Sequence, residues 1–402
     1  MSDASHAITA LHLEHFRNYR ALSLTVPPRP VVLRGHNGAG KTNILEAISL
    51  LAPGRGFRQA RLEEMGRIVN PQSSVVNKEA FGQESSFAAP NSRLTTPSWV
   101  VAAEVLTHGD TAMVGTARDG ASMRDTRIIK INGEQMRGQG ALAAQLCVQW
   151  LTPAMDQVFV EGGSARRKLL DRIVYGFAPE HAARVAAYET AMRERNRLLA
   201  DRTLGDPYWL TVLEQQMAEH AVAITLAREE TLARVRAVLA EPLSHFPRAE
   251  LALEGMLESW LAHGDSALDV EDKLANRLME SRSIDAARGR TTIGIHRSNL
   301  HVIHREKSMP AERCSTGEQK ALLLSIMLAA ARARAEWCGL PPILLLDEVI
   351  AHLDVDKRAS LFDLIRRTAI QAWMTGTDAA DFQGLDGFAT QFEITGGSVK
   401  MC

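Results

Sequence analysis

The sequence is poor in cysteine and in aromatic residues, and its charges nearly cancel. The four cysteines are far apart and lack the spacing of a metal site or a disulfide framework, as is typical of a reducing cytosol. A formal net charge of −1 gives no overall attraction to nucleic acid or to acidic membranes, so any DNA contact has to come from local basic patches or from a groove between two copies. The apolar runs are shorter than a membrane span, and residues 1–6 lack the basic and apolar regions of a signal peptide. These absences predict a cytoplasmic protein without cysteine chemistry.

The first 160 residues are predicted to be mainly short strands. The segments with strand character are 8–16, 21–26, 31–33, 99–106, 112–117 and 126–131. A stretch rich in Ser, Asn, Gln, Pro and Thr, from Asn70 to Ser98, is predicted to be a flexible surface loop. The glycine-rich turn at 53–58 carries Arg55 and Arg58, which either contact phosphate or are solvated loop charges.

Residues 35–42 form a phosphate-binding pattern between the apolar strand 31–33 and a helical run that begins at Asn43. The pattern reads Gly35, His36, Asn37, Gly38, Ala39, Gly40, Lys41 and Thr42. Its glycines let successive backbone N–H groups point at a β-phosphate, Lys41 reaches the β- and γ-phosphate oxygens, and the Thr42 hydroxyl can ligate Mg²⁺. The following helix presents its positive end to the same anion. A nucleoside triphosphate site is therefore predicted here.

A second motif is the apolar run 343–346, which ends in Asp347 and Glu348. A buried strand would deliver Asp347 at its carboxyl end, beside the phosphate loop, where the carboxylate can hold Mg²⁺ through water. Glu348 is then placed to polarise the attacking water as a general base. Alone, the run could be an ordinary strand followed by a helix-capping acid, but its combination with the phosphate loop favours the catalytic interpretation.

A third motif, at 315–320, begins a helix predicted to run through Trp337. Its first residues are Ser315, Thr316, Gly317, Glu318 and Gln319. A hydroxyl residue and a glycine at a helix start expose backbone donors that can bind an anion. The same residues also make an ordinary helix start, with Ser315 as the cap and Glu318 completing a capping box.

The segment 161–288 is predicted to be mostly helical, because strong helix formers dominate it and Gly and Pro are sparse. The basic residues Arg166, Arg167 and Lys168 lie near its start. The segment lacks a sustained heptad, which argues against a long coiled coil. The cluster of Arg193, Arg195 and Arg197 is interpreted as a solvated helix face, balanced by nearby glutamates.

Beyond residue 288 the pattern returns to strands and helices in alternation. Strands are expected at 292–295, 300–303, 343–346 and 371–375, and a helix at 356–367. Such alternation favours a mostly parallel sheet that is covered by helices.

The order of the three motifs resembles an ABC-type ATPase head. The resemblance implies an α/β fold with mixed sheets covered by helices and an inserted, mostly helical second lobe. Residues 1–160 and 289–402 would form the head, and 161–288 the helical arm. In that architecture the segment 315–319 and Asp354 act across an ATP-dependent homodimer, completing the nucleotide site of the partner subunit.

Further stretches resemble the RecF family. They are 16–19 (Phe-Arg-Asn-Tyr), 52–56 (Ala-Pro-Gly-Arg-Gly), 161–171, 315–320, 345–349 and 352–354. The resemblance implies a cytoplasmic recombination mediator that binds ATP, Mg²⁺ and DNA and works with RecR and RecO to load RecA at single-strand gaps. Such a protein serves DNA repair, replication and the SOS response, and it hydrolyses ATP slowly, as a weak DNA-stimulated ATPase that acts as a switch. Within this function, Arg166, Arg167 and Lys168 are predicted to contact DNA.

Three features depart from the family pattern. The polar segment 70–98 is longer than usual, and the family's Gly-Pro-His-Arg-Asp-Asp turn is replaced at 294–299 by Gly-Ile-His-Arg-Ser-Asn, without its two acids. His296 in this turn is equally well a packed core residue. The switch histidine of transporters is absent near Thr375, which fits slow turnover.

Two other functions compete with this one. A transporter-type ATPase subunit is disfavoured by Asn43, because transporter subunits usually have other residues after the Lys-Thr pair. A non-hydrolysing ATP-binding scaffold is disfavoured by the intact Lys41, Thr42, Asp347 and Glu348.

Overall fold

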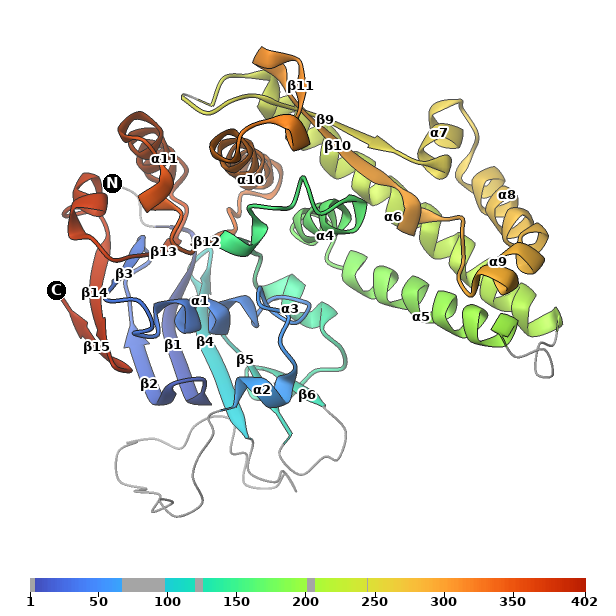
Figure 1. Ribbon diagram of the computed structural model, residues 1–402. Helices are drawn as coiled ribbons and strands as arrows, with labels where there is room; N and C mark the ends of the chain where they lie inside the picture. Colours follow the sequence, from blue (N-terminus) through green and yellow to red (C-terminus); the bar gives the residue numbers. More distant parts are fainter. Residues whose placement is uncertain (1–3, 67–97, 120–125, 201–206, 244) are drawn as a thin grey trace. The chain divides into compact units, whose positions relative to one another are not determined.

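A computed structural model describes residues 4–66, 98–119, 126–200, 207–243 and 245–402 (Figure 1). The predicted polar loop at 70–98 lies outside the described residues, except for Ser98. The chain divides into two compact units, Met1–Pro153 with Arg334–Cys402, and Ala154–Ala333. No helix within the described ranges is long and apolar enough to cross a membrane.

The first unit contains an antiparallel sheet in the order β2-β1-β4-β5-β6-β7. Its strands are β1 (His6–Phe16), β2 (Tyr19–Thr25), β4 (Trp99–Thr107), β5 (Asp110–Arg118), β6 (Arg127–Ile131) and β7 (Glu134–Gln135). Asn132 and Gly133 both have positive φ, 50° and 84°, and form the tight turn between β6 and β7. The meander predicted from the sequence is confirmed.

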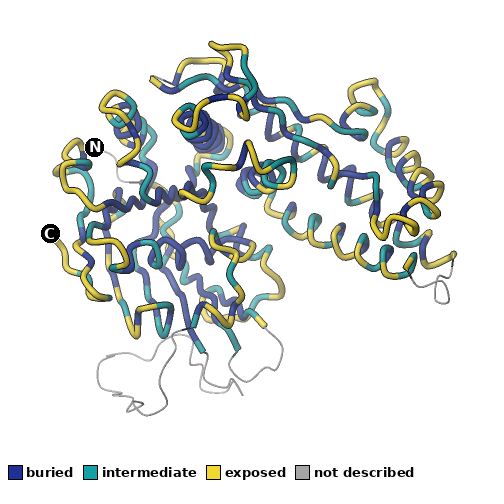
Figure 2. Tube along the Cα trace, in the orientation of Figure 1, coloured by how far each residue is buried: buried dark blue, intermediate teal, exposed yellow. Residues whose placement is uncertain are grey.

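The second sheet of this unit has the order β15-β14-β3-β13-β12-β8. Its strands are β3 (Val31–Arg34), β8 (Val148–Leu151), β12 (Ile343–Leu346), β13 (Ala372–Gly376), β14 (Thr390–Thr395) and β15 (Ser398–Met401). All neighbours pair in parallel except β14 and β15. Every residue of β12 and β13 is buried (Figure 2), as expected for parallel strands covered on both faces.

Short helices accompany the two sheets of the first unit. They are α1 (Lys41–Ser49), α2 (Leu62–Met65), α3 (Gly140–Gln145) and α11 (Val355–Thr368). The buried Gln371 ties the sheets together, because its amide accepts from the Ile8 N–H and donates to the Ile8 carbonyl, both at 2.8 Å. Beyond residue 288, strands and helices alternate along the chain, as the sequence predicts.

The second unit is built around long helices and a small antiparallel sheet. Its elements are α4 (Gly163–Val174), α5 (His181–Ala200), α6 (Pro207–Ala240), β9 (Ala249–Glu254), α7 (Met256–Ala262), α8 (Ala267–Glu280), α9 (Arg282–Arg288), β10 (Asn299–His304) and β11 (Met309–Pro310). The helix α10 (Thr316–Cys338) begins in this unit. An apolar core between α5, α6 and α8 includes Tyr188, Met217 and Leu274. The compact unit thus extends beyond the predicted arm limits of 161 and 288, because residues 154–160, β10, β11 and the start of α10 also belong to it.

Two details of this unit differ from the sequence prediction. Strand β9 was not predicted, because its Ala, Leu and Glu residues are helix formers, although they alternate between buried and partly or fully exposed positions as in a half-buried strand. The expected strand at 292–295 is wrong. Asp285 accepts from both the N–H and the hydroxyl of Thr292, and Gly294 has a φ of 123°, so the backbone turns here.

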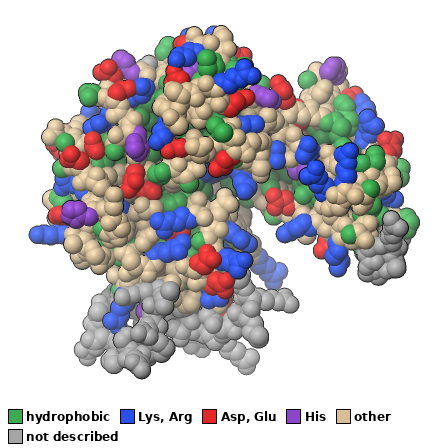
Figure 3. All heavy atoms as spheres, in the orientation of Figure 1, with side chains coloured by type: hydrophobic (Ala, Val, Ile, Leu, Met, Phe, Trp, Pro, Cys, Tyr) green, Lys and Arg blue, Asp and Glu red, His purple; other side chains and the backbone are tan. Residues whose placement is uncertain are grey.

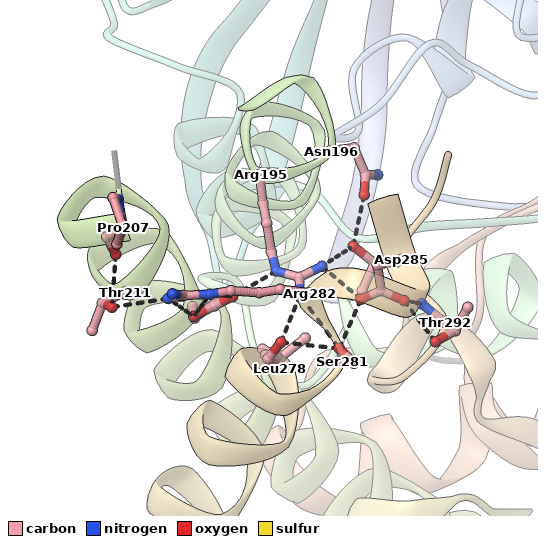
Figure 4. A network of polar contacts seen from close by, with 11 residues as sticks. Arg195, Asn196, Pro207, Thr211, Leu278, Ser281, Arg282, Asp285 and Thr292 are labelled. Carbon is pink, nitrogen blue, oxygen red and sulfur yellow. Dashed lines mark hydrogen bonds and ion pairs between the residues drawn. The ribbon is translucent and has the colours of Figure 1, made fainter. Parts of the chain in front are cut away.

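The solvated-face interpretation of the arginine cluster is wrong for Arg195. Its guanidinium is fully buried and contacts Glu214 at 3.0 Å and Asp285 at 2.8 Å (Figure 4). Residues two apart on a helix point to nearly opposite sides, so Arg195 faces inward while Arg197 pairs with Glu194 at the surface.

Candidate nucleotide-binding site

The phosphate-binding pattern lies between β3 and α1, in a backbone path that depends on glycine. Gly35 and Gly40 have φ values of 148° and 114°. A Cβ on Gly35 would lie 2.3 Å from the Ile394 carbonyl oxygen, and one on Gly40 would lie 2.5 Å from the Asn18 amide nitrogen. His36 and Asn37 are exposed, and Ala39 is half-buried. The loop therefore has the strand-loop-helix context that the phosphate-binding interpretation requires.

Lys41 starts α1 and turns its side chain back into the loop. Its ammonium donates to the carbonyl oxygens of Gly35 at 2.7 Å and His36 at 3.0 Å. Burial lowers the pKa of Lys41, and the negative charges of Glu348 and Asp347 oppose that shift. The loop thus holds a cation at its centre.

Asp347 receives two hydroxyl groups on one carboxylate oxygen. Thr42 donates to Asp347 Oδ1 at 3.0 Å, and Thr375 donates to the same atom at 2.8 Å. The three groups meet because β3, β13 and β12 are adjacent parallel strands, whose carboxyl ends lie at one edge of the sheet. Burial raises the pKa of Asp347, whereas the two hydroxyl groups act to lower it.

Glu348 has a left-handed backbone conformation, with a φ of 56°. Its N–H donates to the Thr375 hydroxyl at 2.9 Å, so one threonine contacts both acidic residues. The Glu348 side chain is half-buried. A non-glycine residue in this conformation is typically held by its surroundings at functional sites. Thr375 was not singled out as a site residue from the sequence, because a threonine at a strand end carries no motif.

The turn between β1 and β2 packs directly on the phosphate loop. The Tyr19 hydroxyl donates to the Gly40 carbonyl at 3.1 Å, and Asn43 donates to the Asn18 side chain at 2.7 Å. The buried Glu46 of α1 accepts from Arg17 in the same turn, at 2.5 Å. The motif 16–19 carries part of the family resemblance, and its contacts show that it supports the phosphate loop.

Arg58 also reaches α1, where its Nη1 donates to Asn43 at 2.8 Å and to Glu46 at 2.9 Å. Its charge acts to lower the pKa of Asp347, which places the guanidinium within electrostatic range of that carboxylate. Arg58 is therefore bound to α1, and a contact between this arginine and phosphate stays a prediction.

The motif 315–319 lies in the second unit and has a capping box. The Ser315 N–H donates to Glu318 Oε2 at 2.9 Å, and the Glu318 N–H donates back to the Ser315 hydroxyl at 3.4 Å. Gln319 donates to the Cys314 carbonyl at 3.0 Å. Thr316 and Gly317 are exposed at the helix start. The capping interpretation thus holds, and it leaves the first backbone donors of α10 at the surface.

Asp354 lies in the first unit and caps α11. Its carboxylate accepts from the Lys357 N–H at 2.8 Å and contacts the Lys357 ammonium at 2.5 Å. The side chain is exposed. The phosphate loop, Asp347, Glu348 and Asp354 therefore all belong to one compact unit.

The basic residues at the start of α4 belong to the second unit. Arg166 donates to the Asn299 side chain at 3.0 Å, Arg167 donates to the Ser298 carbonyl at 2.8 Å, and Lys168 is exposed. Asn299 and Ser298 belong to the turn at 294–299, and Arg166 also donates to the Phe159 carbonyl, so all three acceptors are neutral. In the same turn, His296 hydrogen-bonds to Tyr188 at 2.9 Å, and burial lowers the pKa of this histidine, so it is a packed residue.

Comparisons with known proteins cover almost the whole chain. The family model described as "RecF/RecN/SMC N terminal domain" matches residues 7–389. The DNA replication and repair protein RecF of Rhizobium rhizogenes is 44% identical over 394 residues, which are 98% of this chain and 98% of the relative. The RecF protein of Mesorhizobium japonicum is 45% identical over 98% of this chain and 97% of its own length.

The fold is also that of a solved structure. A chain described as "the recombination mediator protein RecF-ATPrS in RecFOR pathway" aligns with a TM-score of 0.79 at 21% identity, over 100% of this chain and 99% of that one. At this identity the likeness shows the fold, which is an ABC-type α/β ATPase head with an inserted helical lobe. The sequence identities and the family model show more, and the chain belongs to the RecF family of DNA replication and repair proteins.

Proposed function

We propose that this chain is an ATP-dependent switch that binds DNA and acts as a recombination mediator. The observation that carries the nucleotide part is the convergence of the Thr42 and Thr375 hydroxyls on the buried Asp347, beside a glycine-dependent loop with a central lysine. Residues 35–42 would bind the triphosphate through backbone N–H groups, and Lys41 would exchange its carbonyl contacts for phosphate oxygens.

Mg²⁺ fits the oxygen atoms at this site. The Thr42 hydroxyl and the Asp347 carboxylate are hard donors only 3.0 Å apart, and they would hold the ion together with phosphate oxygens and water. The described residues contain no cluster of three or more His, Cys, Asp or Glu that could hold a metal. A magnesium nucleotide site needs no such cluster, since phosphate and water complete the shell. When bound, Mg²⁺ would offset phosphate charge.

Hydrolysis would depend on Glu348. Its carboxylate would accept a proton from the water that attacks the γ-phosphorus, while the bond from that phosphorus to the bridging oxygen breaks and ADP leaves. Lys41 would stabilise the charge on the transferred group. Slow turnover would suit a switch.

Two copies would share each nucleotide. The exposed helix start at 316–317 offers backbone donors to an anion, and Asp354 is exposed on the unit that carries the phosphate loop. In the proposed homodimer, residues 315–319 of one copy complete the site of the other, and Asp354 lies at the interface. ATP would thereby control association.

DNA contacts are assigned to the basic start of α4. The side-chain bonds of Arg166 and Arg167 go to neutral groups. Burial lowers the pKa of Arg167, and the positive charges of Arg228, Arg297 and Arg166 add to this shift, whereas Asp171 opposes it. Elsewhere, on the face drawn in Figure 3, basic and acidic side chains are interspersed. A local patch of this kind meets the requirement set by the near-zero net charge. The proposed partners are gapped duplex DNA, RecR and, through them, RecO and RecA.

The first experiment measures solution mass and binding of a gapped duplex by the Glu348→Gln variant, with and without ATP. Removal of the general base should trap the ATP-bound dimer, so ATP should double the mass and tighten DNA binding. Lys41→Ala is the control and should show neither effect. If the variant binds ATP but its mass and DNA affinity stay unchanged, the shared site is wrong and the scaffold function replaces it.

The DNA assignment has its own test. Lys168 is exposed, so Lys168→Glu should weaken DNA binding while leaving ATP binding intact. Lys400→Glu, an equal charge reversal at an exposed position of the other unit, is the matched control. Equal DNA affinity in the two variants would remove α4 from the DNA surface.

A further inference from the structure

The loop at 50–61 connects α1 to α2, and two side chains from the sheet region hold its beginning. The carbonyl oxygens of Leu50 and Gly54 both accept from the guanidinium of Arg127, which starts β6, with 2.5 Å to Gly54. The Gly54 N–H donates to the Gln139 side chain at 2.7 Å. Gly54 has a φ of 100°, so the loop reverses direction at the point where both of its backbone groups are bound.

Arg127 uses its whole guanidinium for these contacts. Nη1 and Nη2 bind the loop, and Nε donates to the hydroxyl of the buried Thr116 at 2.8 Å. Burial lowers the pKa of Arg127 to about 10, which leaves the group charged at neutral pH. The planar guanidinium has donors in fixed directions, so it can bind the Leu50, Gly54 and Thr116 oxygens at the same time. Its positive charge also lies at the carboxyl end of α1, which carries a partial negative charge.

The other end of the same loop reaches the nucleotide side of α1. The Phe57 N–H donates to the Ser49 hydroxyl at 3.1 Å, and Arg58 follows with its bonds to Asn43 and Glu46. Asn43 follows Thr42 directly and lies two residues after Lys41. The position of Arg58 therefore depends on a loop whose first turn is fixed by Arg127.

We propose that Arg127 is a positioning residue of the nucleotide site, which fixes residues 50–54 and thereby holds Arg58 beside the phosphate-binding loop. The inference rests on the proposed binding of ATP. Through Arg127, the meander of strands between the phosphate loop and the helical lobe would take part in nucleotide binding. Neither the sequence of the meander nor its fold indicates this role by itself.

The test is a double-mutant cycle that uses a fluorescent ATP analogue, mant-ATP, as the probe. Arg127→Gln and Arg58→Ala should each weaken binding about tenfold, the size of one charge-assisted hydrogen bond. If Arg127 acts through Arg58, the double variant should bind no worse than Arg58→Ala alone. Additive losses, or unchanged binding in Arg127→Gln, would overturn the proposal. Arg127→Lys keeps the charge but not the fork, and should bind as weakly as Arg127→Gln.

A second measurement separates this inference from the proposed function. Without nucleotide, hydrogen exchange of peptides covering 50–58 should be faster in Arg127→Gln than in the wild type, while peptides from β12 and β13 should be unchanged. Arg137→Gln, which alters an exposed arginine of the same unit, is the matched control. Unchanged exchange at 50–58 refutes the role of Arg127, whether or not ATP binds. Failure of the wild type and Lys41→Ala to differ in mant-ATP binding refutes the nucleotide site instead.

Discussion

Replacement of Thr375 by valine tests the centre of the site with almost no change in shape. The Thr375 side chain is fully buried, and its hydroxyl donates to Asp347 at 2.8 Å and accepts from the Glu348 N–H at 2.9 Å. Valine removes both bonds and leaves a buried N–H without its partner. One bond to a charged group and one unpaired donor together should lower the free energy of unfolding by about 2–4 kcal/mol.

The same change should affect ATP turnover more than ATP binding. Asp347 keeps its bond from Thr42, so the phosphate loop retains its metal-binding pair, whereas Glu348 loses the contact that holds its left-handed backbone.

The assays are urea unfolding, mant-ATP binding and single-turnover ATP hydrolysis. Thr375→Ser keeps the hydroxyl and should retain hydrolysis. Thr377→Val alters an exposed threonine two residues away and should match the wild type in all three assays. Wild-type stability and turnover in Thr375→Val would refute the argument that this hydroxyl organises the two acidic residues.

Three further changes have defined outcomes. Arg195→Met should cost about 3–5 kcal/mol in urea unfolding because it leaves the buried Asp285 without this cation, while Glu214 keeps its ion pair with Arg282. Arg197→Met, at a surface pair, should cost less than about 1 kcal/mol. Burial lowers the pKa of His6 to about 4, so between pH 6.5 and 4 the unfolded chain binds a proton at this histidine that the folded chain does not bind. The free energy of unfolding should therefore fall by up to about 3 kcal/mol over this pH range. His6→Leu should lack this loss when unfolding is measured as a function of pH. Gly40→Ala should abolish mant-ATP binding because its Cβ meets the Tyr19 hydroxyl at 2.6 Å, while Gly38→Ala, which meets nothing within 4 Å, should retain more of it.

Most of the first unit could be predicted because its patterns are local. The apolar runs of β3 and β12 and the turn residues of the meander follow from neighbouring side chains, and all were found at the expected positions. The motifs at 35–42 and 347–348 were predicted to meet, and they do so because parallel strands bring carboxyl ends together.

The second unit was harder because its decisive contacts are long-range. Strand β9 exists because β10, more than forty residues later, pairs with it, and this pairing overrides the helix propensity of its residues. Arg195 was predicted at the surface because glutamates close to it in sequence could balance its charge, whereas its partners Glu214 and Asp285 come from other helices. Neither contact leaves a signal in a local window of sequence.

The difference between local patterns and long-range contacts also separates the site residues that the sequence predicts from those that it does not. Lys41, Asp347 and Glu348 belong to short motifs whose spacing is set by the chemistry of a phosphate and a metal ion, so the sequence reveals them. Thr375 and Arg127 act by holding other groups in place. This role requires only a hydrogen-bonding side chain at the right point in space, and many positions along a chain could supply one. Residues of this second kind can be recognised only once the strands that bring them to the site are known, so variants at such positions test the structure more directly than variants within the motifs.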